Sequence, residues 1–212
     1  MRNRFDTQLK ELNDQLIEMG NEIISSINNA INALIDKNEE LAKSTMEADI
    51  NVDQQQKIIE NLCFNMLVRQ QPVARDLRVI TAAMKIVTDM ERIGDHAADI
   101  SEMAILMGEN NDINNFPNIK QMAMETIFML NKTMEAYIEK DLTKALVVIN
   151  YDDVVDELFI KSKKDIIQLI LKDPDKGEEI ADLLMVIKYF ERIGDHATNI
   201  AEWVIYSLKG QA

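Results

Sequence analysis

The chain has 212 residues, of which 47% are hydrophobic, so it is long enough to bury a core. A net charge of −14 repels nucleic acid and anionic lipid, and we exclude both as direct partners. Six glycines and three prolines give little punctuation, which favours long helices over strands. There is no basic and apolar leader and no run of about 18 apolar residues, so we expect a soluble cytoplasmic protein without direct membrane insertion.

The first half of the chain predicts three long helices. Apolar residues at steps of three and four over 9–34 form one stripe of a first helix. Residues 36–38 form a break, and a second helical pattern covers 39–70. Pro72 lies near the start of a third helix, where proline is tolerated, and this helix continues to about Met107.

The second half repeats this organisation after a polar stretch at 109–117, in which Pro117 is placed to open the next helix. A fourth helix is predicted over 118–139 and a fifth over 141–172. Residues 173–177 form a turn, and a sixth helix continues to about Lys209.

The segment ERIGDHA occurs twice, at 91–97 and 191–197, and ten of fifteen positions are identical when the match is extended. Each copy lies in the last helix of its half. We therefore predict an all-α protein made of two tandem, duplicated three-helix bundles with six long helices. The bundles are assigned to residues 1–108 and 118–212, with 109–117 as the linker. The alternative, one continuous coiled coil, is disfavoured by the repeated turns.

The repeated segment has two faces when it is placed on a helix at about 100° per residue. Its apolar residues form a core face, and its acidic residues form a column on the other side. The two columns are Glu91, Asp95, Asp99 and Glu102 in the first copy, and Glu191, Asp195, Asn199 and Glu202 in the second. Like charges at this spacing repel by roughly 0.2–0.5 kcal/mol per pair, which indicates that a cation offsets them. Gly94 and Gly194 cost helix stability and indicate the close approach of a neighbouring helix.

The second helix of each half carries a further pair of acids at a spacing of four residues. These pairs are Asp49 with Asp53, and Asp152 with Asp156. If the second and third helices are adjacent, four oxygen-bearing side chains converge in each half. Carboxylates suit magnesium, manganese, calcium or oxidised iron. The residues alone leave two alternatives open, a metal site and a solvated acidic face.

Other residues of the repeat also allow two interpretations. His96 and His196 could add an imidazole ligand, which would widen the choice to zinc or nickel, or could pack at the edge of the acidic column. Arg92 and Arg192 are expected to pair with nearby acids. Cys63 is the single cysteine, so no disulfide is predicted, and its apolar surroundings predict burial.

The sequence resembles the PhoU family, the accessory and regulatory proteins of bacterial phosphate uptake, over essentially its whole length. The resemblance rests on ERIGDHAADI (91–100), ERIGDHATNI (191–200), RQQPVARDLR (69–78) and the two Asp-x-x-x-Asp segments. It implies metal ions at the bundle surfaces, in particular multinuclear iron clusters, with zinc, manganese, magnesium and nickel left open. Carried over position by position, the ligands would be Asp49, Asp53, Glu91 and Asp95 in the first half, and Asp152, Asp156, Glu191 and Asp195 in the second.

The same resemblance implies a negative regulator of phosphate uptake and of the phosphate-responsive two-component system, and not an enzyme. The expected partners are the ATPase subunit of the phosphate-specific ABC transporter and the phosphate-sensing histidine kinase, with the chain acting as a metal-binding adaptor, and a homodimer is expected. Asp99 is replaced by Asn199 in the second copy, and the segment 69–78 has no counterpart there, so the two sites could differ in affinity or partner.

The residues leave two alternatives to this function. The first is a di-metal helical-bundle enzyme, but such enzymes use a Glu-x-x-His pair, whereas His96 follows Glu91 by five residues. No set of nucleophile and base is evident either. The second alternative is a purely structural helical interaction module, in which the acids only face solvent.

Overall fold

The computed structural model describes residues 2–70, 72–108, 113–174 and 177–209. Within these residues the chain forms six long α-helices and one short 3-10 helix, without a strand. The elements are α1 (Arg2–Asp36), α2 (Glu39–Gln70), α3 (Ala74–Met107), η2 (Ile113–Asn115), α4 (Pro117–Glu139), α5 (Leu142–Lys172) and α6 (Gly177–Lys209). The predicted all-α class with six long helices is confirmed.

The break between α1 and α2 lies where the sequence predicts it. Lys37 has a φ of 56°, in the left-handed region that ends a helix. The Asn38 side-chain oxygen then accepts a hydrogen bond of 3.0 Å from the Leu41 backbone N–H, which caps the start of α2. Asp141 has the same role at the start of α5, where its carboxylate accepts hydrogen bonds from the N–H groups of Thr143 and Lys144.

The predicted linker at 109–117 is described only in its second part, since 109–112 lie outside the described residues. There Ile113 and Phe116 are buried against the core. Pro117 is the first residue of α4, as predicted. The predicted turn at 173–177 also lies partly outside the described residues, at 175–176.

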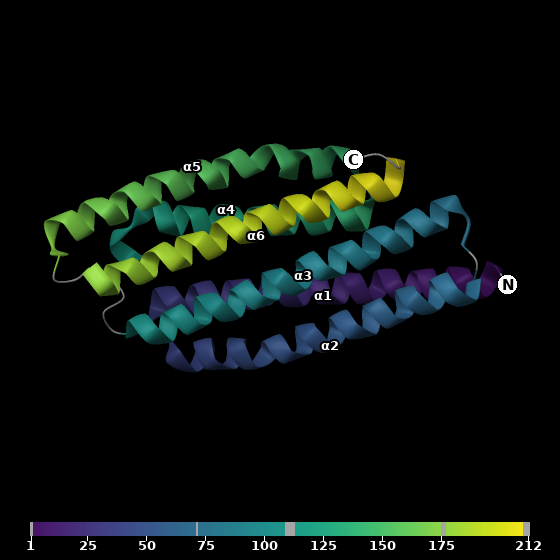
Figure 1. Cartoon of the computed structure of the whole chain (residues 1–212), viewed down its shortest axis with the longest axis horizontal. Coiled ribbons are helices and arrows are strands. Elements are labelled where there is room, and N and C mark those ends of the chain that lie inside the picture. The colour runs from purple at the N-terminus through teal and green to yellow at the C-terminus, as the bar shows by residue number, and fades with distance from the viewer. Residues whose placement is uncertain (1, 71, 109–112, 175–176, 210–212) are drawn as a thin grey trace.

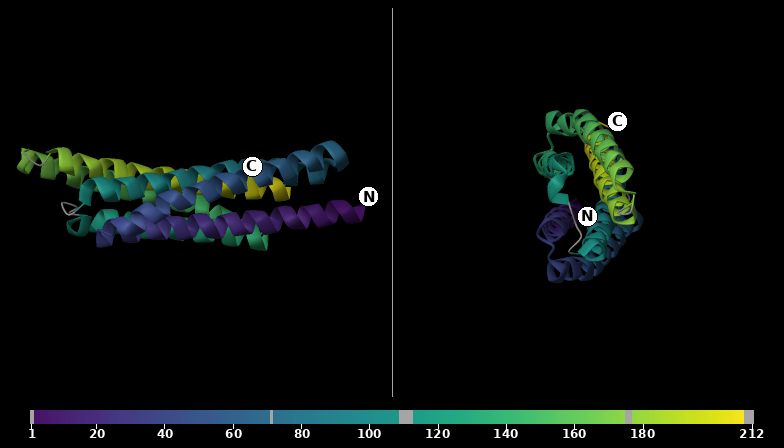
Figure 2. Two further views of the ribbon diagram at one scale, coloured as in Figure 1. Left: turned by 90° about the horizontal axis from the view of Figure 1, so that it is seen from below. Right: turned by 90° about the vertical axis from the view of Figure 1, so that its left-hand side faces the viewer.

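Each half of the chain is an antiparallel bundle of three helices, and the two bundles lie side by side (Figure 1). Helices α2, α3, α6 and α5 form one face of the molecule, and α1 and α4 lie behind them (Figure 2). The halves are joined by the packing of α3 against α6 and of α1 against α4. Buried side chains form one core that runs through both halves. We call the face made by α2, α3, α6 and α5 the four-helix face.

Two contacts behind the four-helix face join α1 to α4. The Met134 side chain fills the space that a Cβ atom at Gly20 would occupy, so glycine at this position lets α4 approach α1. The Tyr137 hydroxyl donates a 2.7 Å hydrogen bond to the Asn13 side-chain oxygen.

Cys63 is buried as predicted, and burial raises the pKa of its thiol to about 12. Across the described part of the chain, no helix is both long enough and apolar enough to cross a bilayer.

The close approach predicted at the two glycines is confirmed, and it differs between the halves. A Cβ atom at Gly94 would lie 2.9 Å from Val52 Cγ1 and 3.2 Å from the Asp49 carboxylate. A Cβ atom at Gly194 would lie 3.5 Å from both Val155 Cγ1 and the Asp152 carboxylate, which is ordinary contact. Helix α2 therefore packs more tightly on α3 than α5 packs on α6.

This difference predicts opposite effects of the same substitution. Gly94→Ala should destabilise the protein by about 1–3 kcal/mol, because the new methyl group overpacks against a stiff valine. Gly194→Ala should be neutral or stabilise by up to about 1 kcal/mol, since alanine is the better helix former and the space is sufficient. Urea denaturation in the presence of a chelator measures both values, and equal losses in the two variants would contradict the assigned packing.

Candidate metal centre

Helices α2 and α3 bring the predicted acids of the first half together. One carboxylate oxygen each from Asp49, Asp53 and Asp95 lies within 4.8 Å of the other two. Glu91 lies one helical turn before Asp95, and its charge is close enough to interact with those of the other three acids. We call these four residues the first acidic cluster. All four side chains are half-buried.

The first acidic cluster carries carboxylates that the protein does not fully satisfy. The pKa of Asp49 is raised from 3.8 to about 6 by burial and then by the charges of Asp95, Asp53 and Asp99. Burial, followed by the charge of Asp95, also raises the pKa of Glu91, although Arg92 opposes this.

One oxygen of Asp49 and one of Glu91 are buried without a hydrogen-bond partner. Such groups destabilise a fold unless something else binds them. A hard cation that prefers oxygen ligands fits this donor set.

Arg92 lies at the outer edge of the first acidic cluster and pairs with its acids, as predicted. Its Nη1 donates a 2.8 Å hydrogen bond to Asp95, and its Nε lies 3.4 Å from Glu91. The Arg92 side chain is 56% exposed, so these contacts add little stability. The arginine reduces the repulsion at the rim of the cluster and leaves the buried Asp49 Oδ1 without a partner.

The two histidines lie at the seam where α3 and α6 meet. Their ring centroids are 5.8 Å apart, and the His96 ring is 5.5 Å from that of Tyr189. His96 Nδ1 lies 3.1 Å from Asp99 on its own helix, whereas His196 Nδ1 lies 2.8 Å from Asp89 across the seam. The packed role that the sequence allowed for the histidines is thus the one observed, and imidazole ligation stays a prediction.

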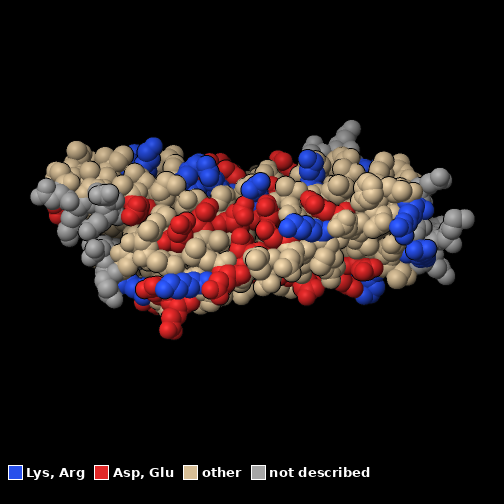
Figure 3. Space-filling model, turned by 60° about the horizontal axis from the view of Figure 1, so that its bottom comes forward, with Lys and Arg blue, Asp and Glu red and all other residues tan. Residues whose placement is uncertain are grey.

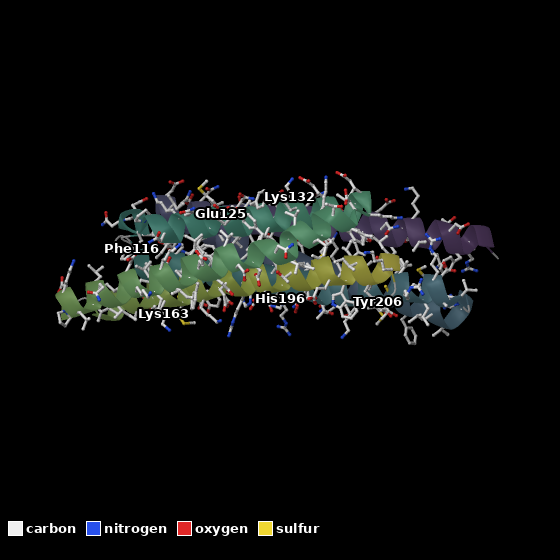
Figure 4. All side chains as sticks on the ribbon, turned by 90° about the horizontal axis from the view of Figure 1, so that it is seen from above. Phe116, Glu125, Lys132, Lys163, His196 and Tyr206 are labelled. Atoms are coloured by element: carbon white, nitrogen blue, oxygen red, sulfur yellow. The ribbon has the colours of Figure 1, made fainter. Side chains whose placement is uncertain are left out.

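A surface cavity of about 540 Å³ opens at this seam. It is lined by the arginines and histidines of both repeats together with Asp49, Asp95, Ala98 and Asp99. Acidic side chains gather near the middle of the molecule in the view of Figure 3. Figure 4 places His196 midway along α6, on the opposite side of the molecule from Glu125 and Lys132 of α4.

The acids of the second half form a looser group, which we call the second acidic cluster: Asp152, Asp156, Glu191 and Asp195. Burial, followed by the charges of Asp156 and Asp195, raises the pKa of Asp152 to about 6. The side chains of Asp156 and Asp195 are nevertheless exposed. Among the described residues, only the first half has three acids with oxygens within 4.8 Å of one another. The structure therefore brings the predicted ligands together closely in one half only.

Lys188 is the residue of the second acidic cluster that sequence reasoning missed. Its ammonium forms an ion pair with Glu191 and opposes the rise in the pKa of Asp156 and Asp195. The predicted pairing of Arg192 with nearby acids is wrong, because Lys188 holds Glu191 and Arg192 makes no ion pair within the described ranges. The sequence does contain a sign of this role: aligning the two copies places Lys188 opposite Thr88, so only the second copy has a cation at this position.

Known proteins match this chain in both of its halves. The PhoU domain matches the chain twice, over residues 16–104 and 119–204. The chain belongs to the PhoU family. A PhoU homologue of the phosphate-specific transport system from Clostridium acetobutylicum is 37% identical over 98% of this chain and 95% of that protein. The homologue from Pseudomonas aeruginosa is 33% identical over 98% of this chain and 86% of that protein.

Solved structures of PhoU proteins have the same fold. The crystal structure of PhoU from Pseudomonas aeruginosa superposes with a TM-score of 0.93 at 32% identity, over 98% of this chain and all of that one. The PhoU structure from Streptococcus pneumoniae gives a TM-score of 0.90 at 28% identity, over 98% of both chains. The family that the two repeats indicate is thus confirmed along the whole length.

The PhoU-like segment at 69–78, which has no counterpart in the second half, lies far from the acids. Its described residues from Pro72 to Asp76 line a separate cavity of about 530 Å³ between the ends of α1, α3, α4 and α6. Ala74 precedes Glu91 by 17 residues of helix, which corresponds to about 25 Å. This segment therefore distinguishes the halves without adding a ligand to the first acidic cluster.

The raised pKa of Asp49 predicts how stability depends on pH in metal-free protein. Because the folded state binds the proton more tightly, this stabilising contribution is complete below pH 3.8 and is lost as the pH rises through about 6. Asp49→Asn should therefore raise the melting temperature at pH 7.5, by roughly 2–4 °C per kcal/mol of repulsion relieved, and change little at pH 3.5. Thermal melts with a chelator, followed by circular dichroism, measure both.

Glu47→Gln on the exposed side of α2 is the matched control, because it removes one negative charge from the same helix outside the cluster. It should leave the melting temperature nearly unchanged at both values of pH. If Asp49→Asn lowered the melting temperature at pH 7.5, the carboxylate would be a stabilising group, and the repulsion assigned to it would be wrong.

Proposed function

We propose that this chain is a regulatory accessory protein of phosphate uptake, which holds uptake and the phosphate-responsive two-component system in check when phosphate is plentiful. The observation that carries this proposal is similarity along the whole chain to proteins named phosphate-specific transport system accessory protein PhoU homolog. The similarity includes both copies of the PhoU domain. A similarity confined to one bundle would support only the fold.

The proposed regulator binds a metal at the first acidic cluster. Asp49, Asp53, Glu91 and Asp95 would hold it, and the buried oxygens of Asp49 and Glu91 support this assignment. Iron, in multinuclear clusters, is the metal that the family resemblance implies, and manganese, magnesium, zinc and nickel remain alternatives. When bound, the metal supplies positive charge that relieves the repulsion between α2 and α3, and so it stabilises the arrangement of these helices on the four-helix face.

The four-helix face is the surface that we assign to partner proteins. Its outer helices expose large apolar side chains, with Ile50 61% and Ile58 55% exposed on α2, and Leu146 48% exposed on α5. The proposed partners are the ATPase subunit of the phosphate transporter and the phosphate-sensing histidine kinase, with a homodimer as a further assembly. In this proposal the chain acts as a cytoplasmic adaptor, and docking holds signalling off.

We propose regulation in preference to catalysis. The family's accessory role supports this, and both histidines are held by carboxylates at the seam between α3 and α6. Robust redox or hydrolytic turnover by metal-loaded protein would instead support the di-metal enzyme. Metal-free protein that binds both partners as well as loaded protein does would support the purely structural module.

Metal content tests the first acidic cluster directly. Protein purified without a chelator should contain bound metal by elemental analysis, and the double variant Glu91→Gln and Asp95→Asn should lose it while keeping its helicity. The substitutions keep the shape of the side chains and remove two negative charges that a hard cation requires. Unchanged metal content in the variant would refute the ligand assignment.

Partner binding tests the regulatory role independently of metal content. A tagged chain should recover the transporter ATPase or the kinase from cells grown at high phosphate, and recovery should fall at low phosphate. Recovery of neither protein at high phosphate would count against the adaptor.

A further inference from the structure

We propose that Lys188 takes the place of a metal ion in the second acidic cluster, so that the chain has one strong metal site and one cluster neutralised by its own lysine. This inference rests on the metal binding assigned under the proposed function. It compares corresponding positions in the two copies of one repeat, and the packing around the two glycines shows which residues correspond. Gly94 faces Val52 and Asp49 on α2, and Gly194 faces Val155 and Asp152 on α5 in the same way.

The corresponding positions 88 and 188 differ in charge. In the first half, the Thr88 hydroxyl donates a 2.9 Å hydrogen bond to the Met84 carbonyl oxygen one turn earlier, so this position adds no cation. In the second half, Lys188 pairs with Glu191, which corresponds to Glu91. In the first half the cation next to Glu91 is instead Arg92, whose Nε lies 3.4 Å from a Glu91 oxygen and whose side chain is 56% exposed.

Lys188 is held over the second acidic cluster from two sides. Besides the ion pair with Glu191, its ammonium lies 5.5 Å from the centre of the Phe159 ring on α5, a favourable distance for a cation. Glu191 is only 16% exposed in its side chain, so this pair is better shielded than a surface pair. The lysine is therefore positioned by both α5 and α6, the helices that supply the acids.

The charge of Lys188 extends to the other acids of the second half, where Asp153 opposes it at Asp156. Lys188 acts on Asp156 and Asp195 as well as Glu191, and it offsets part of the rise that burial causes in the pKa of both aspartates. A metal ion would have to enter beside a fixed positive charge, and the acids are farther apart than those of the first cluster. Both factors weaken metal binding.

The test is a reciprocal exchange of the two residues in the full chain. Mn²⁺ is titrated into chelator-treated protein by isothermal titration calorimetry, with bound Mn²⁺ counted by electron paramagnetic resonance. Wild type should show strong binding at one cluster. Lys188→Thr should add a second class of sites with affinity at least 10-fold higher than the residual binding of wild type, and Thr88→Lys should weaken the first class by at least 10-fold.

Two further variants assign the new sites and guard against misfolding. Asp49→Asn combined with Lys188→Thr should keep only the class created in the second half. Lys188→Gln should also strengthen Mn²⁺ binding there while keeping a long polar side chain. Lys161→Thr is the matched control, since Lys161 is a lysine of α5 whose ion pair is with Glu157, outside the second acidic cluster. Circular dichroism and melting temperature verify the fold of each variant.

The results separate this inference from the proposal on which it rests. Two equally strong classes in wild type, or unchanged binding in both Lys188 variants, would overturn the role of Lys188 while metal binding stands. Absence of Mn²⁺ binding from every variant, together with no metal in freshly purified protein, would overturn metal binding itself. Loss of the first class in Thr88→Lys and a gain in Lys188→Thr would establish the lysine as the determinant.

Discussion

The seam between α3 and α6 is the constraint on which the rest of the molecule depends. Each of these helices must bury an apolar side in its own bundle, contact the other copy, and present acids to a neighbouring helix. The contacts across the seam are polar and specific: Asp89 of α3 binds His196 of α6, and Asn199 donates to the same carboxylate at 3.2 Å. Figure 1 shows α3 and α6 as antiparallel neighbours between α2 and α5, the helices that carry the other acids of the two clusters. A partner docking there would contact both halves at once.

The first acidic cluster combines two features that a purely structural helix pair would avoid. Gly94 permits α2 to approach closely, and the approach places the Asp49 carboxylate in a partly desolvated position beside other acids. Each feature costs stability by itself: a glycine in the middle of a helix weakens it, and a buried carboxylate without a partner weakens the fold. Residues that oppose local rules in this way are expected where binding takes precedence over stability. The glycine and the acids are thus one arrangement, in which the close packing of the helices brings the carboxylates together.

Much of this architecture could be predicted from the sequence. The helices and their breaks follow from apolar periodicity, sparse glycine and proline, and capping residues such as Asp141. The convergence of Asp49 and Asp53 with the ERIGDHA helix followed from spacing and the duplication. What could not be predicted depends on contacts between helices. The role of Asp89 could not be predicted from the repeat, because the second copy has Tyr189 at the corresponding position. Its contact with His196 also joins the two halves, which the sequence of one copy does not show. The error for Arg192 has the same origin, because an arginine next to a glutamate predicts a pair only when no lysine one turn away competes for that glutamate.

Three positions at which the two copies diverge lie around the acids and the seam. Thr88 against Lys188, Asp89 against Tyr189 and Asp99 against Asn199 each change charge, whereas Ile93 and Ile193 are both fully buried and identical. A duplicated helix under selection for packing alone would be free to vary on its solvent side without any pattern in charge. At these positions the second copy gains one cation and loses two carboxylates, whereas α5 carries Asp153 and Glu157 where α2 has Ile50 and Gln54. The first copy keeps the tighter geometry. Together with the cation at Lys188, this difference favours the proposed division of roles, in which the first half binds a metal ion and the second keeps its shape without one.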